Sequence, residues 1–267
     1  MYNGRVMVSN GLYILKLLGG AVYLRVGCNH MRQLLFIITF TLTNIYCFCQ
    51  RQDTLFLKRS LYVDTPYNYT IYHAIYIDSN YATSGLKYLV DFSFGQFDST
   101  TYFEGLKNLT KNKFHKHSLS KQFPRKWIAL YKYKKNFYTY HPSDFGNHCK
   151  FQITDTTTMD FTMEGPEPSL ILSAKQISSN NIEIIRKNYW QGNRLTINII
   201  DTTRGVAIFT FAPTKYRPYS YKRLMVSADK AKIFKTIVNY CPTDKMYEFD
   251  FDKIDFEQLE KNGYSQH

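Results

Sequence analysis

The chain has only five cysteines and two tryptophans in 267 residues, and it lacks the short motifs of several large enzyme classes. It contains no nucleophile elbow (GxSxG), no HExxH, no P-loop and no GxGxxG. No CxxC pair follows residue 49, which excludes a zinc ribbon or a thioredoxin-like site on spacing. The sequence therefore predicts no cofactor and no metal. An enzyme would need a site assembled from residues far apart in the chain.

Acidic residues are scarce: 21 Asp and Glu stand against 34 Lys and Arg, giving a net charge of +13. Residues 1–49 hold four of the basic residues and no acid, so the remainder has 30 basic and 21 acidic residues, a net +9. A field of this sign attracts anions in general, and it does not choose among nucleic acid, anionic lipid and acidic glycan.

Aromatic residues are abundant, with 23 Tyr and 20 Phe. They favour β-structure and argue against disorder. Leu195, Ile197 and Ile199 alternate with polar residues, and Met159 and Phe161 alternate with Asp160, as in strands with one wet face. We predict strands at 69–77, 86–94, 127–133, 137–141, 150–154, 159–163, 170–175, 182–186, 195–200, 206–211 and 222–226.

Short connections between these segments favour antiparallel pairing. The predicted fold class is therefore mainly β, an antiparallel, meander-like barrel or sandwich with one C-terminal amphipathic helix. We place that helix at residues 227–240, where Ser227 is a good N-cap and Ala231, Phe234 and Ile237 follow at helical spacing. A last short helix is predicted in 252–262, and residues 105–125 read as a loop or irregular helix.

Residues 31–49 have the three parts of a secretory signal peptide. Met31 and Arg32 precede an apolar run at 34–42, and Cys47 and Cys49 fit the positions before a cut at Gln50. This predicts a secreted or periplasmic protein with the signal removed near Cys49–Gln50. The alternative is a membrane anchor that is not cleaved, although a span needs about 20 apolar residues.

The signal defines four segments of the chain. Residues 1–30 are interpreted as a leader outside the folded protein, either an over-extended gene start before Met31 or a long cationic leader. After the signal at 31–49 come an aromatic β portion with a basic loop (50–125) and the main antiparallel domain (126–267).

Cleavage would leave Cys149 and Cys241 as the cysteines of the mature protein. Disulfides persist in the oxidising compartments that exported proteins reach. We therefore predict a Cys149–Cys241 disulfide, with two separate buried thiols as the alternative.

The stretch from 105 to 143 carries ten Lys and Arg and no acid, with aromatic residues interleaved. Such a pattern suits anionic polymers, and its plain alternative is a solvated loop followed by strands with a charged outer face. Since export makes nucleic acid a poor partner, we expect an anionic envelope glycan or lipid headgroup. The predicted anionic-ligand surface consists of Lys111, Lys113, Lys116, Arg125 and Lys126.

A second aromatic and basic segment, YRPYSYKR, spans residues 216–223. An exposed tyrosine cluster of this kind can bind sugars or partners, and a proline-bearing loop between two strands explains it equally well.

Two function classes fit the sequence. The first is an exported, non-enzymatic protein that binds an apolar or anionic ligand. The alternative is a secreted hydrolase of a glycan or ester, signalled by a pocket with two facing carboxylates or by His141 near Ser143 with a buried acid. The sequence leaves the ligand and the oligomeric state open.

Overall fold

The computed structural model describes residues 8–9, 12–17, 20–25, 54–64, 69–79, 85–109, 113–120, 123–144, 148–162, 164–188, 192–241 and 247–262. The chain divides into two compact units, Met1–Gln52 and Asp53–His267. In the first unit, three strands form an antiparallel sheet: β1 (Val8–Ser9), β2 (Leu12–Leu17) and β3 (Gly20–Arg25). The predicted signal peptide 31–49 and its cut before Gln50 lie outside the described residues.

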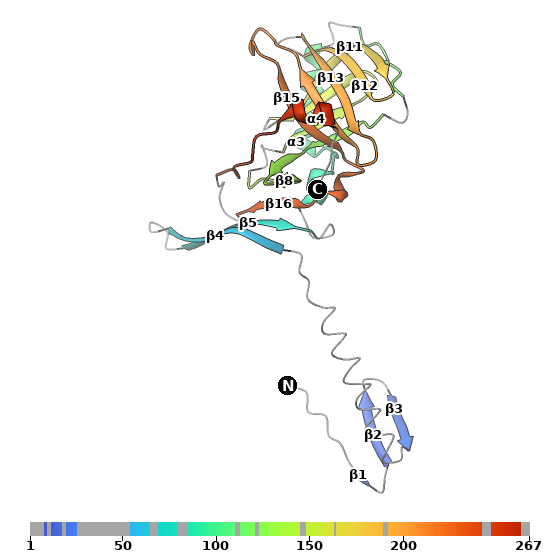
Figure 1. Cartoon of the computed structure of the whole chain (residues 1–267), viewed down its shortest axis with the longest axis vertical. Helices are drawn as coiled ribbons and strands as arrows, with labels where there is room; N and C mark the ends of the chain where they lie inside the picture. Colours follow the sequence, from blue (N-terminus) through green and yellow to red (C-terminus); the bar gives the residue numbers. More distant parts are fainter. Residues whose placement is uncertain are drawn as a thin grey trace. The chain divides into compact units, whose positions relative to one another are not determined.

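Eight strands of the second unit close into an antiparallel barrel in the order β10-β11-β12-β13-β14-β15-β6-β9 (Figure 1). Six consecutive strands form a meander, and β6 and β9 complete the cylinder between β15 and β10. The predicted mainly β fold is therefore confirmed, and it is a barrel. The strands are β6 (Lys126–Ala129), β9 (Lys150–Ile153), β10 (Thr157–Thr162), β11 (Gly165–Ser178), β12 (Asn181–Lys187), β13 (Gly192–Asp201), β14 (Val206–Phe211) and β15 (Tyr221–Ser227).

A five-stranded sheet lies beside the barrel in the order β4-β5-β16-β8-β7 (Figure 1). Only β16 and β8 run parallel in it. The chain passes from the barrel into this sheet at Leu130, so the strand predicted at 127–133 is two strands. The strands are β4 (Thr54–Asp64), β5 (Tyr69–Asp78), β7 (Tyr131–Tyr133), β8 (Asn136–His141) and β16 (Thr236–Tyr240).

Alternate side chains of the barrel strands meet in one apolar core. Trp127 is fully buried there, with its ring 5.2 Å from that of Phe209, and Phe151 packs on the same phenylalanine at 5.3 Å. Burying each such side chain contributes about 1.5–3 kcal/mol. The core also contains Ile153, Ile171, Ile182, Ile184, Leu195, Ile197, Ala207, Phe211 and Met225.

The strand predicted at 86–94 is wrong, because this segment begins as the short helix α2 (Leu86–Leu89). Leu86, Leu89 and Phe92 are buried while the residues between them are exposed or half-buried. A period of three suits a helical turn and not the two-residue period of a strand.

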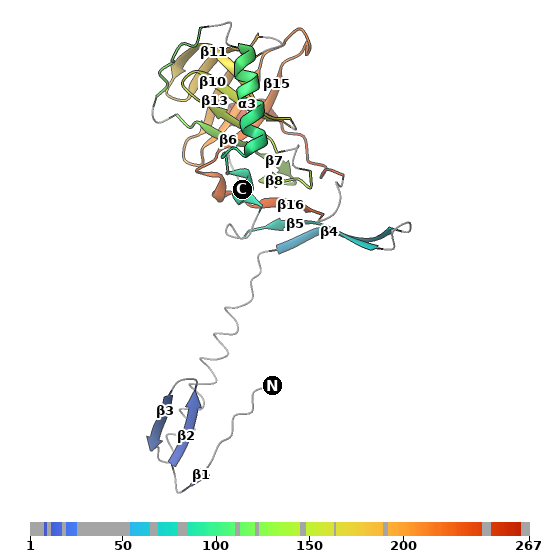
Figure 2. The same cartoon turned by 180° about the vertical axis from the view of Figure 1, so that it is seen from behind.

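A second helix, α3 (Gln96–Leu109), begins nine residues before the segment predicted as loop or irregular helix. It lies across the outside of the barrel (Figure 2) and packs on β11. Gly105 permits this contact, since a Cβ there would sit 2.7 Å from the Pro168 ring.

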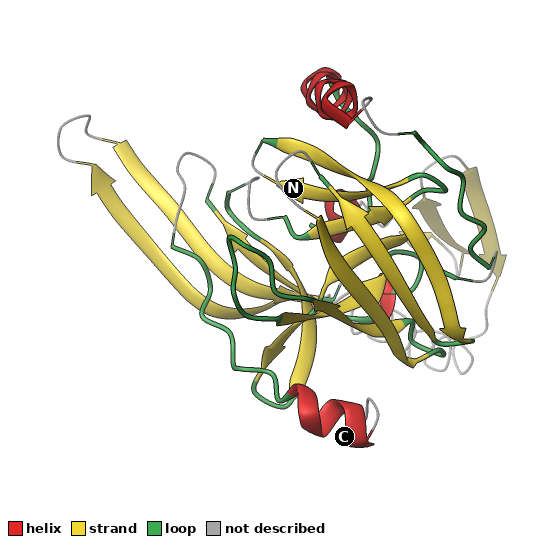
Figure 3. Cartoon of the chain, turned by 90° about the horizontal axis from the view of Figure 1, so that it is seen from above, coloured by secondary structure: helices red, strands yellow, loops and turns green. Residues whose placement is uncertain are grey.

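The helix predicted at 227–240 is also wrong. Ser227 ends β15, a 3-10 turn, η2, spans Ala231–Ile233, and β16 follows. Ala231 and Phe234 pack in the cluster outside the barrel, whereas Ile237 packs in the five-stranded sheet. Because both faces of β16 are buried, its apolar residues do not alternate with polar ones. Together with Ala231 and Phe234 they therefore fitted the spacing of one helical face. The last short helix is confirmed as α4 (Phe256–Asn262), which Figure 3 shows beside the C-terminus, outside the strands.

The predicted Cys149–Cys241 disulfide is wrong, since the two cysteines are not bonded to each other. Cys149 directly precedes β9 and packs against the barrel core, where burial raises the pKa of its thiol. Cys241 follows β16 in the other sheet. The two residues belong to separate parts of the fold, and a disulfide needs Cα atoms within about 7 Å.

Gly205 should not tolerate a side chain. It occupies the turn between β13 and β14 with φ +68°, and an added Cβ would overlap the Ser227 hydroxyl. We expect Gly205→Ala to lower the free energy of unfolding by about 1–3 kcal/mol in urea titrations. Gly95→Ala is the control, because its nearest neighbouring atom is 3.8 Å away. Equal stability of the two variants would contradict the assigned turn.

Candidate functional site

Polar side chains gather at one end of the barrel, inside it. Strand alternation places Arg186 above Ile184 on β12, Asn193 before Leu195 on β13, and Arg223 before Met225 on β15. The guanidinium of Arg186 lies 5.4 Å from the centre of the Phe151 ring, which belongs to the barrel core.

We call this region the barrel mouth; it is a cavity of about 380 Å³. It is lined by Asp160, Phe161, Thr162, Glu167, Arg186, Asn188, Asn193, Ala212, Thr214, Tyr216, Arg217, Tyr221 and Arg223.

Arg186 has three polar partners in the mouth. It forms an ion pair of 2.5 Å with Asp160 and donates hydrogen bonds to Thr158 Oγ1 at 3.1 Å and Asn193 Oδ1 at 2.8 Å. A buried charge is stable only with such partners. These contacts tie β10, β12 and β13 together.

Arg223 differs from Arg186 in having no such partner. With the described residues its guanidinium makes no hydrogen bond and no ion pair. It lies instead 5.5 Å from the centre of the Phe211 ring and 5.3 Å from that of Tyr221. Arginine is always charged in proteins and offers five N–H donors. The mouth therefore presents a cation whose N–H donors have no partner among the described residues, although, against the effect of burial, the nearby Cys149 and Asp160 raise its pKa.

Two carboxyl groups face each other across neighbouring strands of the mouth. Asp160 on β10 is directly opposite Glu167 on β11. Burial and the nearby Asp160 raise the pKa of Glu167, while a 3.0 Å hydrogen bond from Asn188 Nδ2 opposes that shift. The lining of the mouth holds three arginines, Arg186, Arg217 and Arg223, against these two carboxyl groups, so its formal charge stays positive even when both carboxyls are ionised.

Aromatic rings form the rim of the mouth. Tyr221 stacks on Phe211 with ring centres 4.5 Å apart and planes 6° apart, and Arg217 lies 4.2 Å from the Tyr221 ring centre. Residues 212–220 connect β14 to β15 here, and Tyr216 on this loop is 66% exposed. The Tyr221 ring therefore packs between the buried Phe211 ring and the Arg217 guanidinium, whereas Tyr216 is the exposed ring of this rim.

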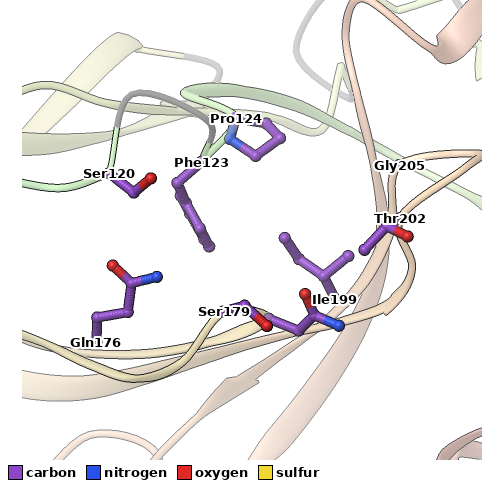
Figure 4. A pocket seen from close by; sticks show the side chains of 9 residues that line it. Ser120, Phe123, Pro124, Gln176, Ser179, Ile199, Thr202 and Gly205 are labelled. Carbon is purple, nitrogen blue, oxygen red and sulfur yellow. The ribbon is translucent and has the colours of Figure 1, made fainter.

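The opposite end of the barrel holds a smaller, neutral pocket. Buried Leu119 and Phe123 reach into the barrel core from the segment before β6. Figure 4 shows the pocket of about 260 Å³ between this segment and the loops of the facing strands. Its lining has no ionisable side chain: Ser120, Phe123, Pro124, Gln176, Ser179, Asn180, Ile199, Thr202 and Gly205.

Of the five predicted anion-binding residues, the four that the structure describes do not line the mouth. Lys111 lies outside the described residues, and Lys113 and Lys116 are exposed on the segment 113–120. Arg125 pairs with Asp155 at 3.5 Å, and the Lys126 ammonium lies 5.4 Å from the centre of the Phe92 ring.

The segment 216–223 does contribute to the mouth, through Tyr216, Arg217, Tyr221 and Arg223. Arg186, Asp160 and Glu167 were not identified from the sequence as site residues. The available signal was a charged residue at an inward position of an otherwise apolar strand face, as in Ile182, Ile184 and Arg186.

The structure places His141 among other rings, and the nearby Asp144 is buried. The His141 ring lies against Gly85 and is 5.8 Å from the Tyr88 ring and 5.2 Å from that of His148. Burial lowers the pKa of His141 and lowers that of His148 to about 4.

In the part of the chain that the structure describes, no three His, Cys, Asp or Glu side chains are grouped so that they could hold a metal ion. Across the same residues, no helix has the length and apolar character needed to cross a bilayer.

Glu167 should make stability depend on pH. The pKa of Glu167 is raised in the folded protein, so the unfolded chain loses this proton at a lower pH than the folded chain does. Raising the pH from the unfolded pKa through the folded pKa therefore lowers the free energy of unfolding. We expect Glu167→Gln to gain more stability relative to the parent at pH 7 than at pH 4, measured by urea unfolding. The exposed Glu164→Gln is the control. The same difference at both pH values for Glu167→Gln would contradict the assigned environment.

In comparisons with known proteins, no protein-family model, curated protein or solved structure matches the chain.

Proposed function

We propose that this protein is an exported, non-enzymatic binding protein that holds a small anionic ligand in the barrel mouth. The observation that carries the proposal is the Arg223 guanidinium, which is half-buried at the inner face and lacks a hydrogen-bond or ion-pair partner among the described residues. Taking a charge out of water is costly unless a partner compensates it, and an anion supplies that compensation.

The shape of the mouth limits the ligand. A cavity of about 380 Å³ is at the small end of the usual range for ligand pockets. Below the polar groups lie the rings of Phe151 and Phe211. We infer a ligand with a carboxylate, sulfate or phosphate group and a flat or apolar body, of the size of one acidic sugar or one lipid headgroup.

The proposal of export rests on the sequence of residues 31–49. As partners we propose those that the sequence predicts, an anionic envelope glycan or lipid headgroup. An anionic envelope glycan or lipid would present the kind of group that Arg223 can bind. Exposed Lys113 and Lys116 would attract the same partners without contacting the bound group.

An aromatic sulfonate tests the proposal. We expect the protein to bind 1-anilinonaphthalene-8-sulfonate, measured by its fluorescence, and Arg223→Gln to weaken binding about tenfold or more. A hydrogen bond to a charged group contributes about 1.5–3 kcal/mol, and 1.4 kcal/mol is a factor of ten.

The matched control is Arg194→Gln. It removes the same charge from β13, where Arg194 is 60% exposed and pairs with Glu183 at 3.6 Å. If the Arg223 and Arg194 variants bind the dye equally well, the mouth is not the anion site.

A hydrolase of a glycan or ester is the second candidate, favoured by the facing pair Asp160 and Glu167. A carboxylic acid of raised pKa beside a second carboxylate is the arrangement that general acid catalysis uses. Under this alternative the protein cleaves chromogenic glycosides or esters, and Glu167→Gln lowers the rate by at least about 100-fold. Dye binding without turnover supports the binding protein.

A further inference from the structure

The hairpin of β4 and β5 extends beyond the sheet that it belongs to. β16 pairs with β5 only from Tyr240 opposite Ala74 to Thr236 opposite Asp78. Among the described strands, residues 60–64 and 69–73 have only each other as backbone pairing partners, and Figures 1 and 2 show this arm leaving the body of the second unit. A two-stranded ribbon is marginally stable in water, so the arm lacks the support that a third strand gives.

The two edge strands of the five-stranded sheet differ in whether another segment of the described chain covers them. At β7 the C-terminal segment covers the edge, with the Asp252 N–H donating to Lys132 O at 2.9 Å. At β4 no described strand pairs with the outer edge. Natural proteins protect open edges with charges, prolines, bulges or short strands, because an open edge pairs with other chains.

Protection of β4 is confined to its first half. A bulge interrupts the register between Phe56 and Lys58, and Arg59 follows with its guanidinium over the Phe56 ring. From Ser60 onward the register with β5 is regular and no charged residue occurs before Asp64. Leu61 within this half is 70% exposed, which is unusual for a leucine in mid-strand.

We propose that the outer edge of β4 pairs antiparallel with β4 of a second copy of this chain, with Leu61 at the two-fold axis. In this register Leu61 meets Leu61 of the second copy and buries apolar surface that is otherwise exposed. Lys58 is opposite Asp64, so residues of opposite charge face each other twice. The pairing excludes the bulge, and two five-stranded sheets become one. Such an interface is isologous, as in most homodimers.

Disulfide cross-linking tests the proposed register of the two β4 strands. Opposite residues of antiparallel strands have Cα atoms about 4.5–5.5 Å apart, within disulfide range. In the full-length protein, Leu61→Cys oxidised with diamide should give a covalent dimer whose linked peptides are joined at position 61 by mass spectrometry. Val63→Cys is the matched control, since position 63 faces Arg59 in the same register. Failure to link at position 61, or equal linking at 61 and 63, overturns the register.

The oligomeric state is measured separately by light scattering. We expect the parent to show a mass that rises from monomer to dimer with concentration. Leu61→Lys should remain a monomer, because two ammonium groups would meet at the axis. Leu172→Lys, at a 48% exposed leucine of β11, should behave like the parent. A parent that remains monomeric, or a Leu61→Lys variant that still dimerises, contradicts the proposal.

Discussion

Closure of the barrel between β9 and β10 decides which side chains face inward, and the rest of the structure follows from that assignment. In a closed cylinder every second residue of each strand points into a space of limited volume. Trp127, Phe151 and Phe209 are among the largest fully buried side chains there, and they pack on one another. The same alternation carries Arg186 and Arg223 to the inner face, where neither guanidinium can be treated as an ordinary solvated charge.

The two inward-facing arginines of the mouth differ in their partners. Arg186 and Asp160 compensate each other, and the hydrogen bonds of Thr158 and Asn193 complete the pair. The Arg223 guanidinium lies 5.5 Å from the Phe211 ring centre and 5.3 Å from the Tyr221 ring centre, and it makes no hydrogen bond or ion pair with a described residue. An anion is the complement of such a group, so the geometry favours ligand binding over a purely structural role for this residue.

A buried hydrogen-bond chain anchors the five-stranded sheet where the arm leaves it. His73 Nε2 donates to Asn239 Oδ1 at 2.7 Å, and Asn239 Nδ2 donates to the Tyr140 hydroxyl at 3.1 Å. That hydroxyl in turn donates to Glu248 at 2.6 Å. These bonds join β5, β16 and β8 in one fixed register, because each buried polar group has a single arrangement that satisfies it. Beyond His73, the described residues of the arm have no strand partner but each other, although the Tyr72 ring still lies 6.4 Å from that of Tyr240 on β16.

Much of the fold was predictable from local patterns, and the errors have a common cause. The two-residue period located the strands from β9 to β15, because each has one face against the core. It failed at β16, which is buried on both faces, and at α2, whose burial follows a three-residue period. Part of the candidate site was predictable: the composition of segment 216–223 marked it as a possible binding segment. Nothing in the composition around Arg186, Asp160 and Glu167 marked them as lining the same cavity.

The sequence by itself determined the β class, the turns and the excess of positive charge, because these depend on composition and on neighbours along the chain. Only the tertiary structure decided that Cys149 and Cys241 are not joined and that Arg186 is paired while Arg223 is not. It also decided that one sheet edge is covered and the other open. Such outcomes depend on which distant strands become neighbours when the cylinder closes, and no local pattern encodes that.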